Sequence, residues 1–278
     1  MNRVGERKRL RLWVVGGLVL QMTGLIGCIS ITSNDPSIRR EAVRQLSDQT
    51  TLAGVAQNDI DADVRCAAVE RLTDQAVLAK IVIEDKQVAV RKAAVSKLTD
   101  QATIASVAQH DTDVDVRCAA IDKLDDQALL VKLAIEEPNA GIRAVAVRRV
   151  TNPASLARIA QTDSDADVCR AAVAAVTDQA LLAKIATEGT IVRTRLAAVE
   201  RMTDQALLSG IAVADKLSTV DGTNGVADGN AVRAAAVIKL DDKALLAKIK
   251  SEDKSNAVRF AAEVRLMNLE GIRQPGQR

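Results

Sequence analysis

The chain has 278 residues and a formal net charge of +2 at pH 7, from 38 Lys and Arg against 36 Asp and Glu. Its apolar residues are almost all aliphatic, with one Phe, one Trp and no Tyr. Base stacking and phosphate neutralisation supply most nucleic-acid affinity, so this composition excludes a nucleic-acid partner. A core of Ala, Val, Leu and Ile favours thin helical layers, which are typical of a repeat protein.

The first 27 residues have the composition of an export signal. Five basic residues are followed by an apolar run from Leu12 to Gly27, which corresponds to the n-region and h-region of a signal peptide. The run ends in Leu25-Ile26-Gly27-Cys28.

This ending resembles the lipobox of bacterial lipoproteins, in which the bond before the cysteine is cut and the cysteine receives acyl chains. The resemblance implies a signal peptide over residues 1–27, lipid on Cys28 and a short tether over residues 28–37. Ile29 follows where a lipoprotein retained at the inner membrane would carry Asp, which favours the outer membrane, facing the periplasm. Two alternatives stay open: an uncleaved membrane helix, since residues 12–31 match the roughly 20 residues that cross a bilayer, and a soluble secretory signal.

Residues 38–267 are repeats of 26 residues, interrupted once by a 12-residue insertion and ending in an incomplete ninth copy. The repeats begin at Ile38, Val64, Val90, Val116, Ile142, Val168, Thr194, Val232 and Val258. Position one is β-branched, position five is always Ala, and position nine is an aliphatic residue or Met. Spacings of four place these positions on one stripe of a helix.

A second apolar pattern follows in each repeat, commonly after Thr-Asp-Gln, as at residues 73–75. Thr and Asp cap helix starts, so we predict a second helix with Leu or Ile at position fifteen and an aliphatic residue three further on, as in Leu182 and Ile185. Isolated helices need roughly 12–15 residues to be stable in water, so these shorter helices must stack on their neighbours. The sequence therefore predicts an all-α solenoid of eight to nine helix pairs.

Charged residues recur at two more positions of the repeat. Position two carries Arg39, Arg65, Arg91, Arg117, Arg143, Arg195, Arg233 and Arg259. Position twenty-two carries Asp59, Asp85, Asp111, Glu137, Asp163, Asp215 and Asp253. The sixth repeat departs from both rules, with Cys169 and Gly189.

This pattern, Val-Arg-x-Ala-Ala-Val-x-x-Leu with an acidic linker, resembles the short HEAT-like repeats of bacterial proteins. The resemblance implies a right-handed alpha-alpha solenoid in which a structural ladder of Arg and Asp runs between adjacent repeats. Because ordinary HEAT repeats have about 40 residues, the helical variant class of leucine-rich repeats stays open as an alternative.

A basic row recurs at position seventeen, on the second helix: Lys80, Lys132, Arg158, Lys184 and Lys248. If the second helices line the concave face, as the HEAT resemblance implies, this row forms a positive groove for an acidic protein or an anionic envelope polymer. The alternative is a solvated helix face, balanced by the acidic linkers.

No pattern in the sequence predicts a reaction, a cofactor or a metal site. His110 is the single His, and we place it in a linker as an ordinary polar residue. Cys66, Cys118 and Cys169 lie at equivalent or neighbouring repeat positions, too far apart for disulfides. The insertion at 215–231 is rich in Gly, Asn and Asp but lacks the EF-hand spacing, so we predict a surface loop.

We therefore expect a membrane-tethered, non-enzymatic scaffold that binds one or more proteins of the bacterial cell envelope. Two other functions stay open: a HEAT-like enzyme or enzyme subunit of the lyase or glycosylase type, and a purely structural spacer. An enzyme of that type would need aromatic residues in a pocket, and the repeats contain only Phe260.

Almost every recurring residue has a packing, capping or ladder role, so we expect function where the pattern breaks. The breaks are Pro153, Cys169, Gly189, Gly210 and the 215–231 loop. Residues 268–278 are predicted to form a C-terminal tail.

Overall fold

The computed structural model describes residues 31–214 and 225–271 of the chain. The described residues up to Asp100 and those from Gln101 onward form two compact units, each described here by itself. The described part is all-α and contains no strand, which confirms the predicted fold class. The predicted signal peptide, Cys28 and most of the predicted C-terminal tail lie outside the described residues.

The helices follow the repeat, with two for each full copy. The first unit contains α2 (Pro36–Gln45), α3 (Gln49–Asn58), α4 (Ala62–Arg71), α5 (Gln75–Glu84) and α6 (Val88–Lys97). The second unit begins with α7 (Gln101–His110), α8 (Val114–Ile121), α9 (Gln127–Glu136), α10 (Ala140–Arg149), α11 (Pro153–Thr162) and α12 (Ala166–Ala175). It continues with α13 (Gln179–Glu188), α14 (Val192–Arg201), α15 (Gln205–Val213), α16 (Gly225–Ile238), α17 (Lys243–Glu252) and α18 (Asn256–Leu269).

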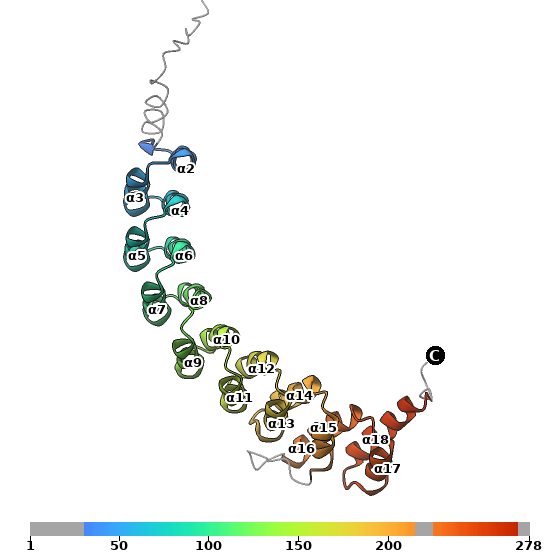
Figure 1. Ribbon diagram of the computed structural model, residues 1–278. Coiled ribbons are helices and arrows are strands. Elements are labelled where there is room, and N and C mark those ends of the chain that lie inside the picture. Colours follow the sequence, from blue (N-terminus) through green and yellow to red (C-terminus); the bar gives the residue numbers. More distant parts are fainter. Residues whose placement is uncertain (1–30, 215–224, 272–278) are drawn as a thin grey trace, which may run out of the picture. The chain divides into compact units, whose positions relative to one another are not determined.

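Within each unit the helices form a repeated array of packed pairs, as expected of a solenoid (Figure 1). The first helices of the repeats carry even numbers and the second helices odd numbers. Each second helix packs most closely against the first helix of the following repeat, as α3 does against α4 and α11 against α12. Successive first helices also pack side by side, which joins one repeat to the next.

The core consists of the predicted apolar stripes. In the second repeat, Val64, Ala68 and Leu72 at positions one, five and nine are completely buried. Leu182 and Ile185 are buried on the second helix, as predicted. Position six contributes a further aliphatic side chain, such as Val69, that the stripe pattern had not included. Each helix therefore buries a wider face than spacings of four alone indicate.

Aspartates begin most of the helices. Asp74 accepts hydrogen bonds from the backbone amides of Ala76 and Val77, and Asp126 caps α9 in the same way. These bonds satisfy amides that a helix start leaves without partners. In Thr-Asp-Gln the Asp is thus the cap, and the Thr has another role, described below.

The loop predicted before the eighth repeat, at residues 215–231, does not extend over all of these residues. Helix α16 begins at Gly225, so residues 225–231 are helical, whereas 215–224 lie outside the described residues. The insertion rich in Gly, Asn and Asp is thus divided between these two parts, because its Asp228-Gly229-Asn230 segment belongs to the helix. At the other end of the array, α18 continues to Leu269, two residues into the predicted tail. In the described ranges no helix combines the length and the apolar character needed to span a bilayer.

Candidate functional site

The recurring Arg and acid form buried ion pairs within a repeat. Arg39 binds both carboxylate oxygens of Asp59 at 2.8 Å, and Arg143 binds Asp163 in the same geometry at 2.8 Å. The side chains of Arg143 and Asp163 are 11% and 7% exposed. Equivalent pairs join Arg65 to Asp85, Arg117 to Glu137 and Arg233 to Asp253.

These pairs alter the acidity of their members. Hydrogen bonds from Arg39 hold the pKa of Asp59 below its ordinary value. Burial acts in the opposite direction on Asp163, yet hydrogen bonds from Arg143 and the Asp165 amide keep the pKa of this carboxyl lowered as well. Both carboxylates are therefore stabilised in the charged form that pairs with Arg.

The same guanidinium groups also connect adjacent repeats. Nη1 of Arg65 donates to the Asp59 carbonyl at 2.8 Å, and Nη1 of Arg143 donates to the Glu137 carbonyl at 3.0 Å. Arg117, Arg195 and Arg233 instead use Nε to reach a carbonyl of the preceding second helix. The resemblance had implied that the ion pair itself runs between repeats, but the pair lies inside one repeat and the link is to backbone. We call the arginines at position two the Arg row.

A second set of bridges, the Gln row, occupies position twelve. Oε1 of Gln127 accepts from the amide and the hydroxyl of Thr151 at 2.9 Å, while its Nε2 donates to the Arg149 carbonyl at 3.1 Å. The row consists of Gln49, Gln75, Gln101, Gln127, Gln179 and Gln205. In three of the Thr-Asp-Gln segments, the Thr residues Thr73, Thr99 and Thr203 thus bond to the Gln of the preceding repeat.

A third set, the capping row, consists of basic residues at position eight. Arg71 Nε donates to the Leu46 carbonyl at 2.9 Å, at the end of the preceding first helix. The other members are Arg149, Arg201, Lys239 and Arg265. Last carbonyls of a helix have no partner within it, so these side chains complete the helix end and fix the next repeat at once.

Neither the Gln row nor the capping row was predicted, although both were visible as recurrences. Gln stands at position twelve in six of the eight full repeats, and Lys or Arg at position eight in seven of the nine copies. Their roles need the position of the next repeat, which the sequence of a single repeat does not supply.

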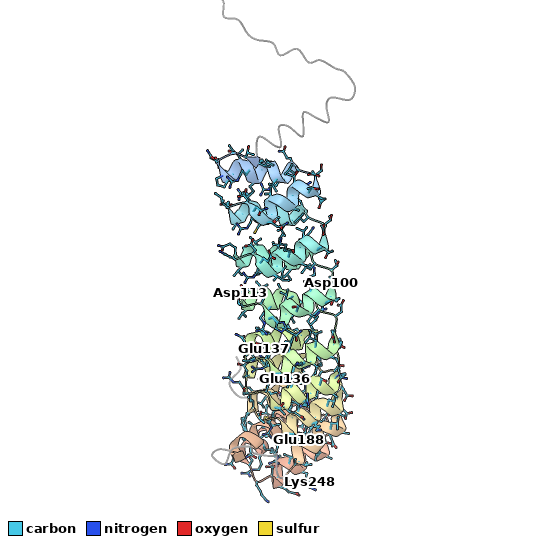
Figure 2. The ribbon with its side chains drawn as sticks, turned by 90° about the vertical axis from the view of Figure 1, so that its left-hand side faces the viewer. Asp100, Asp113, Glu136, Glu137, Glu188 and Lys248 are labelled. Atoms are coloured by element: carbon cyan, nitrogen blue, oxygen red, sulfur yellow. The ribbon has the colours of Figure 1, made fainter. Side chains whose placement is uncertain are left out.

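The predicted binding groove at position seventeen lies on exposed second helices. Lys80, Lys132, Arg158, Lys184 and Lys248 occupy α5, α9, α11, α13 and α17, and all five are exposed. Figure 2 looks onto this face and labels Glu136, Glu188 and Lys248 on it. The structure thus places the row on one kind of helix face within each unit.

Glutamates accompany the lysines of this row. A Glu stands four residues after each of the four lysines, at Glu84, Glu136, Glu188 and Glu252. Lys80 and Lys184 each lie 3.9 Å from that Glu, at the limit of an ion pair. Opposite charges four residues apart are neighbours on a helix. The surface therefore alternates in charge. The row does not form a purely positive groove. We call the four lysines and the four glutamates that follow them the Lys–Glu row.

The row also differs from the expected groove in its position. From α7 to α14, the even-numbered first helices lie on the inner side of the bend of the second unit, and the second helices lie outside (Figure 1). The expectation that second helices line a concave face was therefore wrong for this stretch. At α8 to α11, the first helices α8 and α10 pack more closely than the second helices α9 and α11, as expected for the inner side of a bend.

Two cavities of the second unit lie near residues that the sequence singled out. A cavity of about 580 Å³ lies between α10 and α12, lined by Ala144, Arg148, Asp167 and Arg170 among others. A smaller one of about 220 Å³ brings His110 and Lys132 together beside the Arg117–Glu137 pair.

The prediction that His110 lies in a linker was wrong, because His110 is the last residue of helix α7. Its Nδ1 contacts the Ser106 carbonyl at 3.0 Å within the same helix. Over the described ranges there is no group of three or more His, Cys, Asp or Glu side chains arranged to hold a metal ion.

The three cysteines of the repeats are free thiols. Burial is the main cause that raises the pKa of all three, Cys66, Cys118 and Cys169, which disfavours the reactive thiolate. Cys169 is completely buried, and its Sγ lies 3.2 Å from the Asp163 carbonyl, where other repeats place a guanidinium.

The remaining breaks in the pattern have different surroundings. A Cβ at Gly210 would meet no atom within 4 Å, so no close approach requires glycine there. At Gly189 a Cβ would lie 2.7 Å from the Ile185 carbonyl oxygen and 3.2 Å from Cγ of Arg195, so backbone and side chain both approach this position. Phe260 is 66% exposed on α18.

Comparison with protein-family models and with curated proteins finds no match to this chain. The repeated array of helix pairs defines it as a helical-repeat protein.

Proposed function

We propose that the chain is a non-enzymatic scaffold of the bacterial cell envelope, built from short HEAT-like repeats and tethered to a membrane by lipid on Cys28. Its described repeats would present an extended surface to one or more envelope proteins. Surfaces of this kind are what stacked helix pairs offer to partners.

One observation carries the binding part of this proposal. The residues that hold the repeats together lie at the helix ends, in the Arg, Gln and capping rows. The Lys–Glu row has no part in these bridges, and its side chains are exposed over α5 in the first unit and α9, α13 and α17 in the second. A charged surface without a structural task is available for recognition.

Alternating charge suits a protein partner better than a uniform anionic polymer. Each Lys has a Glu one turn away, so a uniformly negative chain would meet repulsion as often as attraction. A folded partner can match both signs, which contributes more to specificity than to affinity. We therefore propose a protein whose contact surface is also of mixed charge, in place of the acidic partner first expected.

The test is photo-crosslinking in cells, with a reactive residue placed at Lys132 or Lys184 on the outer face, or at Ala171 in the cavity between α10 and α12. A reproducible adduct from Lys132 or Lys184 is the expected result. An adduct from Ala171 alone would indicate that the partner binds to the first helices instead. Absence of any defined adduct from all three positions would contradict the scaffold and favour a spacer.

The tether has a separate test, because Cys28 lies outside the described residues. Cells are labelled with a radioactive fatty acid, and the wild-type protein is compared with Cys28→Ala. We expect the label to be lost in the variant, since the thiol is the proposed site of attachment. A control, Cys66→Ala, should keep the label, and equal labelling of Cys28→Ala and wild type would exclude lipid on Cys28.

A further inference from the structure

One junction of the second unit lacks the side-chain bridges found at the others. It lies between the repeat at 142–167 and the repeat at 168–193. Pro153 stands in place of the Gln row, Cys169 in place of the Arg row and Ala175 in place of the capping row.

Every other junction within a unit keeps at least two of these three rows. At the preceding junction, for example, Gln127, Arg143 and Arg149 all reach across. At the following junction Gln179, Arg195 and Arg201 do the same. The losses are therefore concentrated at one place.

The replacements cannot provide equivalent bonds. Proline has no side-chain amide, and alanine has no polar atom. The thiol of Cys169 keeps a contact with the Asp163 carbonyl at 3.2 Å, but an S–H group is a weak donor. Gly189 removes the acid that would have paired with an Arg at position 169, so the missing pair leaves no buried carboxylate behind.

Besides the thiol contact and the backbone bonds of the linker itself, apolar packing and a backbone hydrogen bond between α11 and the end of α13 remain across this junction. Helix α12 packs on α10 and α11, and α13 packs along α11, at least as closely as the corresponding helices do at the two neighbouring junctions, so what this junction lacks is the directional bridges. The amide of Thr190 donates to the Gln161 carbonyl at 3.2 Å. Hydrophobic contact resists separation of two surfaces but is not directional, so it constrains their tilt less than bridging hydrogen bonds do.

A groove open to solvent runs along the first-helix side of the same junction. The cavity of about 580 Å³ is lined by the small residues Ala140, Gly141 and Ala144 of α10 and Ala171 and Ala174 of α12. Arg148 of α10 and Asp167 and Arg170 of α12, all exposed, line the same space, which is therefore open to solvent.

We infer that this junction is a hinge built into the array, at which the helix pair α12–α13 changes its tilt against α10–α11 and opens or closes the cavity between α10 and α12. Hinges absorb motion at a few positions while the flanking segments remain rigid. The inference does not depend on the proposed scaffold function, because it concerns only the repeats themselves.

The test is a pair of distance distributions measured by double electron–electron resonance on the full chain in detergent. One pair of spin labels, at Lys132→Cys and Lys184→Cys, spans the junction in question. The control pair, at Ser106→Cys and Arg158→Cys, also joins second helices two repeats apart but does not span it. Cys28, Cys66 and Cys118 are replaced by Ser, and Cys169, which is completely buried, is retained.

We expect the distribution across the junction to be about twofold broader than the control, because only this pair includes the hinge. Equal widths, or a broader control, would overturn the inference.

A restored variant tests the cause. Pro153→Gln and Ala175→Arg together rebuild the Gln-row and capping-row bridges, while Cys169 and Gly189 are kept, because a Cβ at position 189 would lie 2.7 Å from the Ile185 carbonyl oxygen. In a variant with wild-type helix content, we expect the width to fall to that of the control pair, and an unchanged width would overturn the assignment to the missing bridges. If the variant does not fold, the comparison of the two pairs in the wild type still decides.

Discussion

At the scale of single residues, the buried ion pairs set the stability of each repeat. Arg143 satisfies both oxygens of Asp163 and also two carbonyls of the preceding linker. Removing the Arg would leave a buried carboxylate and two carbonyls without these donors, and such losses exceed the net value of the pair itself. Surface pairs differ, because water replaces the lost partner.

Arg143→Ala should therefore destabilise the protein by about 3 kcal/mol, measured as a lower urea midpoint. Arg170→Ala is the matched control, since Arg170 is exposed and pairs with Asp167 one turn away on the same helix. We expect the control to change stability by less than about 0.5 kcal/mol. Equal midpoints for the two variants would contradict the structural role of the Arg row.

At the scale of helices, sequence patterns predicted the elements well and their connections poorly. The stripe at positions one, five and nine and the Asp of Thr-Asp-Gln located the first and second helices, since both signals are local. The Gln row escaped prediction because Gln127 acts on Thr151 and Arg149 of the next repeat. Its presence in Thr-Asp-Gln was read only as part of a helix start.

Gln127→Ala should destabilise the second unit by about 1–2 kcal/mol, because it removes bonds to two backbone groups of the next repeat. Gln109→Ala serves as its control, since that side chain bonds only to the Ala105 carbonyl of its own helix. Chemical denaturation followed by circular dichroism measures both. If Gln127→Ala were as stable as Gln109→Ala, the Gln row would have no part in holding the repeats together.

At the scale of the whole molecule, the repeat period predicted the array of helix pairs, because nine copies in one register repeat the same packing problem. The sequence correctly placed the lysines of the Lys–Glu row on the second helices. It did not predict that these helices lie on the outer side of the bend or that glutamates balance the lysines. Both depend on how successive repeats tilt, and tilt follows from the bridges and from close packing of the first helices. Among the predicted breaks, Pro153, Cys169 and Gly189 all belong to the proposed hinge region.

We propose that the Lys–Glu row binds a partner and does not contribute to the stability of the repeats. The most direct measurement is crosslinked partner yield and melting temperature for the double variant Lys132→Glu and Lys184→Glu, with the crosslinking residue at Arg158 between them. We expect the yield to fall severalfold while the melting temperature changes by no more than about 2 °C, as is usual for exposed charges. An undiminished yield, or a large loss of stability, would contradict the claim.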